Sequence, residues 1–219
     1  MKINWDSEVL SSVSKVVDQL EHLSINKDSI ESVADWLAYE EFPIPSSAAV
    51  RDDADDFIRA TMFMNTLNFA FTDFDKSIKY EINEDGKILS DSEAMYFQVN
   101  NAISSGIKLT DGNEMASISL HQLKNIFVGN IEMPMLKERV EILNEVGQKL
   151  VDSYEGDWIN FINNGPKKLY SDGGGLIERL IEEFPRFDDS SQFKESNVKF
   201  YKLAQLAFWV IHAELSGSN

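Results

Sequence analysis

The ten residues from Phe200 to Trp209 constrain the fold more than any other stretch of this sequence. Eight of them are apolar: Phe200, Tyr201, Leu203, Ala204, Leu206, Ala207, Phe208 and Trp209. A helix that is apolar on nearly every side is normally buried all round. The upstream chain is therefore expected to supply the walls around this segment.

The residues before this segment predict how the chain enters it. Phe184-Pro185 is a helix stop, because a residue before proline is driven out of the helical region. An acidic turn containing Asp188 and Asp189 follows. We expect the chain to re-enter a helix at Val198 and to stay helical through Gln205.

Length and composition predict one folded helical domain over residues 1–219. Hydrophobic residues make up 43% of the chain and aromatic residues 11%, which is typical of a globular core. We find no internal repeat and no linker long enough to divide the chain. The absence of cysteine excludes disulfides and thiolate metal sites. No signal-peptide pattern and no apolar run near the ~20 residues of a membrane span is present, so a cytoplasmic location is expected.

The charge of the chain bears on its partners. Its 37 acidic and 20 basic residues give a net charge of −17. Extended nucleic-acid binding needs clustered Lys and Arg, so we expect no direct nucleic-acid partner. A small anionic ligand is compatible with this charge, because a few local donors override the global field.

Hydrophobic periodicity predicts a mainly α fold. Helices are expected over residues 6–23, 29–39, 55–64, 92–104, 119–127, 136–154, 158–163 and 176–184. Asp28, with Glu31 three residues later, predicts a capping box for the second helix. Residues 109–118 are expected to form a loop. The alternation around 78–82, followed by Asn83 to Gly86 and residues 87–89, predicts one small β-hairpin near 78–89 and no other β structure.

Two polar features carry alternative interpretations. Asn65 and Asn68 interrupt an apolar run, so they either close the backbone at a helix end or belong to a pocket rim with Phe69 and Phe71. Gly173 to Gly175 precede a helix and form either a flexible connector or a phosphate cradle. The three histidines are isolated, so no metal site is expected, and the known nucleotide motifs are absent.

Five ordered stretches add a resemblance. TLNFAF (66–71), SLHQLKNIF (119–127), MPMLKERVEILNEVG (133–147), FPRFDD (184–189) and VKFYKLAQ (198–205) resemble the queuosine salvage family. In order and spacing they are similar to its queuosine 5′-phosphate N-glycosylase/hydrolase members. The similarity runs from about Trp36 to the C-terminus.

The resemblance implies a helical fold akin to DNA glycosylases, without metal or nucleotide cofactor. It implies hydrolysis of the N-glycosidic bond of queuosine 5′-phosphate, which releases queuine for reuse in tRNA. In such chemistry a carboxylate stabilises an oxocarbenium-like centre and activates water. Aromatic side chains would sandwich the flat base.

The resemblance also implies site residues. Asn68, Phe69 and Phe71 match one motif and are expected to line the substrate pocket. Lys202 matches the lysine of the Phe-Tyr-Lys motif, and it either contacts the phosphate or ribose or forms a structural salt bridge. Asp188 and Asp189 are expected to cap a helix rather than to catalyse.

The chain departs from the family pattern at two places. A histidine is typical of the loop where this chain has Tyr39 to Phe42. The family continues into a Phe-Ala-Asp-Tyr-Arg segment with the catalytic aspartate, whereas this sequence reads HAELSGSN and stops, so no catalytic residue is assigned.

Two hypotheses therefore stand: a glycosidase, or a non-catalytic relative that binds a ligand or a protein. Both leave the face around Phe200, Phe208 and Trp209 partly uncovered, which predicts self-association or a partner chain.

Overall fold

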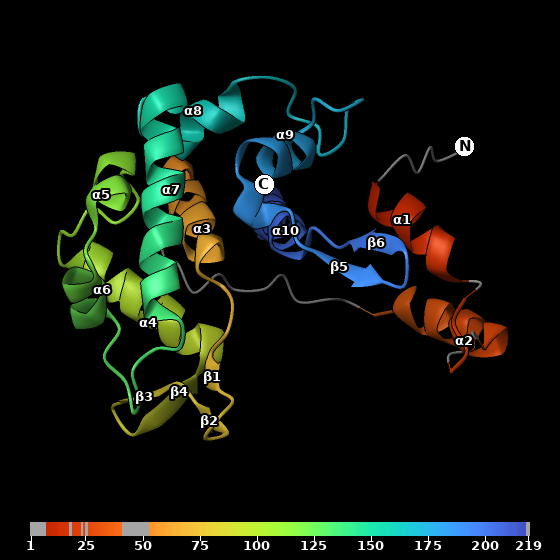
Figure 1. Ribbon diagram of the computed structural model, residues 1–219, viewed down its shortest axis with the longest axis horizontal. Coiled ribbons are helices and arrows are strands. Elements are labelled where there is room, and N and C mark those ends of the chain that lie inside the picture. Colours follow the sequence, from red (N-terminus) through yellow and green to blue (C-terminus); the bar gives the residue numbers. More distant parts are fainter. Residues whose placement is uncertain (1–7, 18, 23, 25, 41–52, 218–219) are drawn as a thin grey trace.

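The computed structural model describes residues 8–17, 19–22, 24, 26–40 and 53–217, and the described part is mainly helical, as predicted (Figure 1). The longer helices are α3 (Ala54–Thr66), α4 (Asp91–Ser104), α7 (Leu136–Tyr154) and α10 (Lys202–Gly217). The shorter ones are α1 (Glu8–Val17), α2 (Lys27–Leu37), α5 (Gly112–Ser117), α6 (Leu120–Ile126), α8 (Trp158–Asn163), α9 (Leu176–Glu183) and the 3₁₀ turn Pro185–Phe187.

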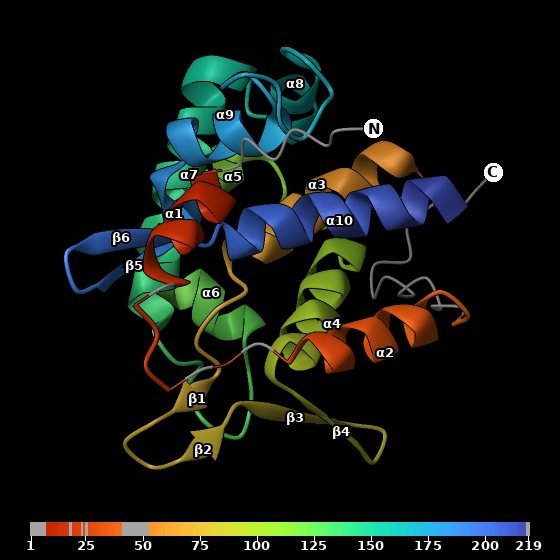
Figure 2. The ribbon, with the colours of Figure 1, turned by 90° about the vertical axis from the view of Figure 1, so that its right-hand side faces the viewer.

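Helix α10 lies along α3 at the centre of the molecule, and the two run in opposite directions (Figure 2). Helix α3 also contacts α4 and α8, and α7 packs against α5, α6 and α8. Trp158, Phe161, Phe184 and Tyr154 join α7, α8 and the end of α9, with ring centroids 4.9–5.8 Å apart in edge or tilted contacts. Such aromatic pairs stabilise a core beyond the area that they bury.

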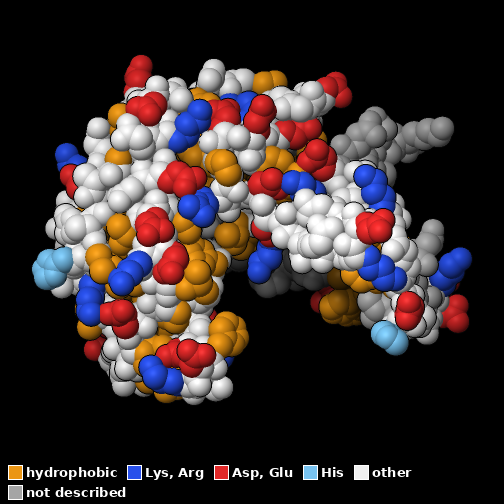
Figure 3. All heavy atoms as spheres, in the orientation of Figure 1, with side chains coloured by type: hydrophobic (Ala, Val, Ile, Leu, Met, Phe, Trp, Pro, Cys, Tyr) orange, Lys and Arg blue, Asp and Glu red, His pale blue; other side chains and the backbone are white. Residues whose placement is uncertain are grey.

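The surface is hollowed between the part that holds α7 and β1 and the part that holds α1 and α2 (Figure 3). Hydrophobic side chains gather on the side of the hollow next to α7 and β1. Figure 1, in the same orientation, draws the segment that leads from α3 into β1 at the position of this side of the hollow.

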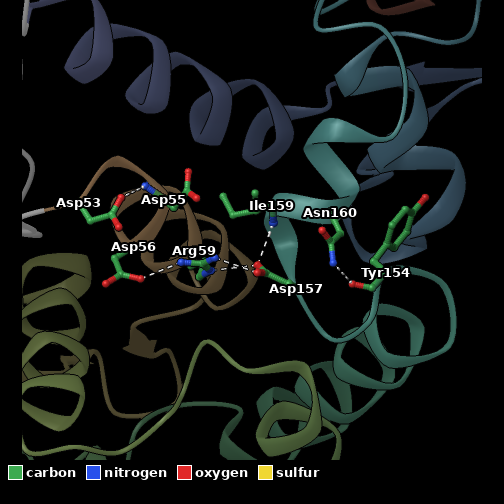
Figure 4. A network of polar contacts seen from close by, with 8 residues as sticks. All are labelled: Asp53, Asp55, Asp56, Arg59, Tyr154, Asp157, Ile159 and Asn160. Carbon is green, nitrogen blue, oxygen red and sulfur yellow. Dashed lines mark hydrogen bonds and ion pairs between the residues drawn. The ribbon is translucent and has the colours of Figure 1, made fainter.

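An ion-pair network fixes α3 against α8 (Figure 4). Arg59 donates from Nε and Nη2 to the two carboxylate oxygens of Asp157, at 3.0 and 2.8 Å, and also pairs with Asp56 at 2.8 Å. Asp157 accepts the N–H of Ile159 at 2.9 Å and so caps α8 as well. One carboxylate thus joins two helices and starts the second of them.

The β structure is more extensive than the single hairpin that we predicted. The predicted hairpin exists as β3 (Glu81–Glu84) paired with β4 (Lys87–Ser90), but residues 78–79 belong to β2, which pairs with β1 (Thr72–Asp73). A third antiparallel pair joins β5 (Ser190–Phe193) to β6 (Ser196–Lys199). The pairs β1–β2 and β5–β6 were not predicted, because strands this short carry little alternation of apolar and polar residues.

The C-terminal prediction was therefore wrong at its start. Residues 198–201 do not begin a helix, because Val198 and Lys199 end β6 and Tyr201 has a φ of 50°. That left-handed conformation cannot continue an α-helix, so α10 begins only at Lys202.

The expected all-round burial of this segment is only partly observed. Ala204, Ala207 and Phe208 are buried, but Phe200 is 44% and Trp209 is 52% exposed. The prediction that Phe208 belongs to an uncovered face is wrong, since only 3% of it is exposed. The uncovered apolar residues in this region are Phe200 and Trp209.

Three further details correct the sequence prediction. Asn26, not Asp28, caps α2, because its side chain accepts the N–H of Ser29 at 3.1 Å. Helix α1 stops at Val17 instead of reaching residue 23. Residues 112–117, expected in a loop, form α5, which Asp111 caps and which packs on α7. None of the described helices combines the length and the apolar character needed to cross a membrane.

Candidate functional site

The candidate site is centred on the turn that follows α3, residues 67–71. Helix α3 ends because Leu67, its C-cap, leaves helical geometry, and Ala70 adopts a left-handed φ of 48°. The turn then enters β1 beside the hollow described above. This turn contains three of the four residues that the resemblance assigned to substrate binding.

Arg139, on α7, holds this turn in place. Its guanidinium donates hydrogen bonds to the carbonyl oxygens of Leu67, Phe69 and Ala70, the last at 2.9 Å. The guanidinium carbon lies 4.3 Å from the centre of the Phe69 ring and 5.1 Å from that of Phe71. Arg139 thus orients Phe69 through its backbone carbonyl and its ring, and Phe71 through its ring.

The environment of Arg139 is unusual for a charged residue. The side chain is fully buried, and burial lowers its pKa to about 10. Its Nε donates to the carbonyl of Pro134 at 3.1 Å, and it forms no ion pair with a carboxylate of the described residues. Carbonyl dipoles and aromatic faces therefore offset the charge in place of an acid.

Arg139 was not among the predicted site residues, although the sequence contains a signal for it. Arg139 lies three residues after Leu136 and four before Leu143, which places it on the apolar face of α7. A cation on an apolar helix face needs partners inside the protein. Here the backbone carbonyls of the turn at 67–71 are those partners.

Asn65 and Asn68, the two asparagines that interrupt the apolar run, have different roles in the structure. Asn65 is buried, and its amide nitrogen donates to the carbonyl of Thr61 at 2.9 Å, so it closes the end of α3. Asn68 is half-buried and donates to the hydroxyl of Tyr96 on α4 at 3.0 Å. Burial raises the pKa of Tyr96, which therefore stays a neutral phenol that accepts this bond. Asn68 thus joins the turn to α4.

Tyr80 supports the other end of the turn. Its backbone N–H donates to the carbonyl of Phe71 at 2.8 Å, and its buried hydroxyl donates to Gln98 at 2.7 Å. Burial raises the pKa of Tyr80 to about 12, so it remains neutral at physiological pH. Three residues outside the turn, Arg139, Tyr96 and Tyr80, therefore fix its conformation.

Lys202, the fourth predicted site residue, lies at the first position of α10 and is exposed. Its backbone N–H donates to Asp189 at 2.8 Å, which confirms Asp189 as a helix cap. Asp188 instead binds the ammonium of Lys199 through both oxygens, at 2.7 and 2.8 Å. No carboxylate of the described residues forms an ion pair with the Lys202 ammonium, so the structural salt bridge considered above is not observed there.

The structure does not place Lys202 in contact with the turn. The two are related through the packing of α10 along α3: the N-terminal end of α10 and the C-terminal end of α3 lie toward the same side (Figure 2). Of the four predicted residues, Phe69 and Phe71 therefore contact Arg139, Asn68 lies in the same turn but binds Tyr96, and Lys202 is a separate exposed lysine.

Comparison with known proteins gives the family. The family described as "Queuosine salvage protein" matches residues 48–219, which include the turn, α7 and Lys202. The chain belongs to this family. The resemblance seen in the five sequence stretches is thus confirmed.

Individual relatives agree with this assignment. The chain is 30% identical over 144 residues to a bovine "Queuosine 5'-phosphate N-glycosylase/hydrolase" and 30% identical over 184 residues to one from Nematostella vectensis. It is 24% identical over 214 residues to one from Sphaerobacter thermophilus. These alignments cover 65%, 82% and 96% of this chain, but only 41%, 49% and 64% of the respective relatives. The chain therefore spans less than two thirds of the length of these relatives.

In this queuosine salvage chain, a carboxylate of the protein itself binds the backbone amides around the glycine run at 173–175. The Glu178 carboxylate accepts the N–H groups of Ser171, Gly173 and Gly175 at 2.7, 3.0 and 2.8 Å. Burial raises the pKa of Glu178, but these three bonds outweigh it, so the pKa is lowered overall. Because a side chain of the protein occupies these amides, the loop is a connector in this structure rather than a phosphate cradle.

Two further expectations concern a metal site and the loop at 39–42. Within the described residues, no group of three or more His, Asp or Glu side chains is arranged to hold a metal ion. The loop where the family has a histidine runs from Tyr39 to Phe42, and its last two residues lie outside the described part of the chain.

Proposed function

We propose that this chain acts in queuosine salvage by binding queuosine 5′-phosphate and hydrolysing its N-glycosidic bond, with release of queuine. The family match over residues 48–219 carries the proposal. The names of the bovine and Sphaerobacter relatives support this reaction rather than another salvage step. Such hydrolysis would supply queuine for the modification of tRNA.

The turn at 67–71 supports a role in holding a flat base. Phe69 and Phe71 are two aromatic residues whose orientation is fixed by Arg139, and rigid aromatic faces bind a heterocycle with little loss of side-chain entropy. The turn borders a hollow with an apolar side, where such a ring would be removed from water. Asn68 offers an amide oxygen that accepts no hydrogen bond from the described residues.

Lys202 supports binding of the phosphate. Its ammonium is exposed and has no acidic partner in the described part of the chain, so its charge is available to an anion. A single available cation can orient a phosphate even in a protein of net charge −17.

The proposal extends to fold, location and assembly. Residues 1–219 form one helical domain related to DNA glycosylases, with no cofactor, in the cytoplasm. The exposed pair Phe200 and Trp209 is a site of self-association or of a partner chain.

The test is to incubate the purified protein with queuosine 5′-phosphate and to measure free queuine by mass spectrometry and binding by calorimetry. Lys202→Ala should weaken binding about tenfold, as for loss of one charge-assisted contact. Lys108→Ala is the matched control, since Lys108 is also exposed and belongs to none of the site elements.

The outcomes separate the hypotheses. Release of queuine supports the glycosidase. Binding without release favours the non-catalytic relative, and the absence of both contradicts the proposed function.

A further inference from the structure

The structure has a second concave surface, which residues 67–71 do not line. It is a groove of about 660 Å³ between β3, the end of α4 and the connection between α6 and α7. This volume is in the range of ligand-binding clefts. None of Asn68, Phe69, Phe71, Arg139 and Lys202 lines it.

The apolar part of the groove comes from three separate elements. Ile88 of β4 is 55% exposed, Ile107 after α4 is 43% exposed, and Val128 after α6 is 66% exposed. Single exposed aliphatic side chains are ordinary, but three that converge on one groove form a contiguous apolar surface. They lie beside the half-buried Phe97 and Ile126.

The charged side chains that line the groove are acidic. Glu81 and Glu84 are the charged residues that line it, and neither forms an ion pair with a described lysine or arginine. The nearby Lys87 and Lys124 are already paired with Glu93 and Glu132. The groove therefore disfavours phosphates and favours a cationic ligand.

The edge of β3 next to the groove presents free backbone groups. Hydrogen bonding alternates along an antiparallel strand, so every second residue points its N–H and C=O away from the partner strand. Glu81 is such a residue, because its N–H and C=O bind Asn130 on the outer side at 2.8 and 2.9 Å. Asn83, two positions along, points the same way, and its backbone N–H and C=O form no hydrogen bond with the described residues.

Side-chain amides along the same groove are also available. Asn101 forms no side-chain hydrogen bond with the described residues, and Asn83 uses its oxygen for the N–H of Gly86 but leaves its nitrogen free. Asn130 and Gln98, in contrast, are engaged with backbone groups and keep the walls in place. Free donors and acceptors next to a strand edge are the features that recognise a peptide backbone.

We propose that this groove binds an extended basic segment of a partner protein, which adds a strand to the edge of β3 at Asn83. Aliphatic side chains of the segment occupy the surface formed by Ile88, Ile107 and Val128. Its Lys or Arg residues lie on the opposite face of the added strand and pair with Glu84, which points away from the face of Ile88. The backbone pairing supplies affinity, and the alternation of apolar and basic side chains supplies specificity.

The test uses a fluorescein-labelled peptide of alternating Lys and Val, with a Glu and Val peptide of equal length as its counterpart. Fluorescence polarisation measures binding to the whole chain, and the backbone amide of Asn83 is followed by NMR. We expect the basic peptide alone to bind and to shift the Asn83 amide. Val128→Asp and Glu84→Lys should each weaken binding about tenfold or more, a typical loss for a central contact.

Matched variants separate this groove from the general acidity of the protein. Leu169→Asp changes an exposed apolar residue elsewhere, and Glu141→Lys changes an exposed acid on α7, so both should leave the affinity within about twofold. Circular dichroism establishes that each variant is folded. Equal weakening by the groove variants and their controls would overturn the proposal, as would no binding by any basic peptide.

Backbone methylation tests strand addition directly. N-methylation of alternate residues removes the donors on one edge of the peptide. One of the two alternate sets should abolish binding and the other should not, because only one edge faces β3. Equal tolerance of both sets would contradict strand addition, and binding of a single-stranded oligouridine in place of the peptide would contradict the choice of partner.

Discussion

Arg139 shows that the role of an arginine side chain depends on its surroundings. The same side chain on the exposed face of α7 would be a solvated cation, but at zero exposure it joins two aromatic rings and the carbonyls of a turn. Its removal would leave several buried carbonyls without a donor, at about 1–3 kcal/mol for each.

Replacing Arg139 by Met should therefore lower the free energy of unfolding by about 3 kcal/mol or more, and Arg139→Lys by less, since lysine keeps the charge but not the planar fork. Urea denaturation measures both. Lys137→Met, an exposed change on the same helix, should shift the value by less than about 0.5 kcal/mol. A loss for Arg139→Met as small as that of the control would contradict the role given to Arg139.

Glu178 makes a prediction about pH. Its folded-state pKa lies below the ordinary value of 4.5, so the unfolded chain binds more protons in acid. The contribution of Glu178 is therefore complete above pH ~4.5 and is lost as the pH falls through the lowered pKa. Glu178→Gln should cost about 1 kcal/mol at neutral pH, the typical loss of a cap, and should make stability less sensitive to acid.

The measurement is the melting temperature by circular dichroism at neutral and acidic pH. Glu182→Gln changes an exposed acid on the same helix and should leave the acid dependence of the wild type intact. If both variants show the same dependence, Glu178 does not close the glycine loop as described.

At the scale of elements, Asp157 combines two functions that substitutions can separate. Asp157→Asn keeps an oxygen for the N–H of Ile159 but loses the charge that faces Arg59, whereas Asp157→Ala loses both. We expect a loss of about 1 kcal/mol for the first and about 1 kcal/mol more for the second, by thermal or urea unfolding.

Asp56→Asn is the control for the ion pair, because Asp56 binds the same arginine from a side chain that is 62% exposed. It should cost less than about 0.5 kcal/mol. Equal losses for Asp157→Asn and Asp157→Ala would show that the cap contributes nothing.

Some helices and turns could be predicted from the local sequence pattern alone. The helix that starts at Ser119, the long face of α7 and the stop at Phe184-Pro185 were predictable, because each depends on residues within one or two turns. The β5–β6 hairpin and the late start of α10 were not. They depend on Lys199 pairing with Asp188 and on the backbone N–H of Lys199 reaching Ser12, 187 positions away.

At the scale of the whole molecule, Phe200 and Trp209 leave apolar area in contact with water. If a second chain covers them, sedimentation should show association that rises with concentration, and Phe200→Ser with Trp209→Ser should abolish it. Phe74→Ser, at a side chain that is 82% exposed, should not. A monomer at every concentration would contradict self-association and leave a different partner as the remaining form of the proposal.

The sequence by itself determined the family and the helical class, because motifs and periodicity are properties of neighbouring residues. It also predicted Asn68, Phe69, Phe71 and Lys202 as site residues. Only the tertiary structure decided that Phe69 and Phe71 share one buried cation while Lys202 stands apart, and that the glycine loop encloses its own carboxylate. Arg139 and the turn are about 70 positions apart, and no local pattern specifies which distant carbonyls a buried charge will meet. The packing of α7 beside the end of α3 decides it.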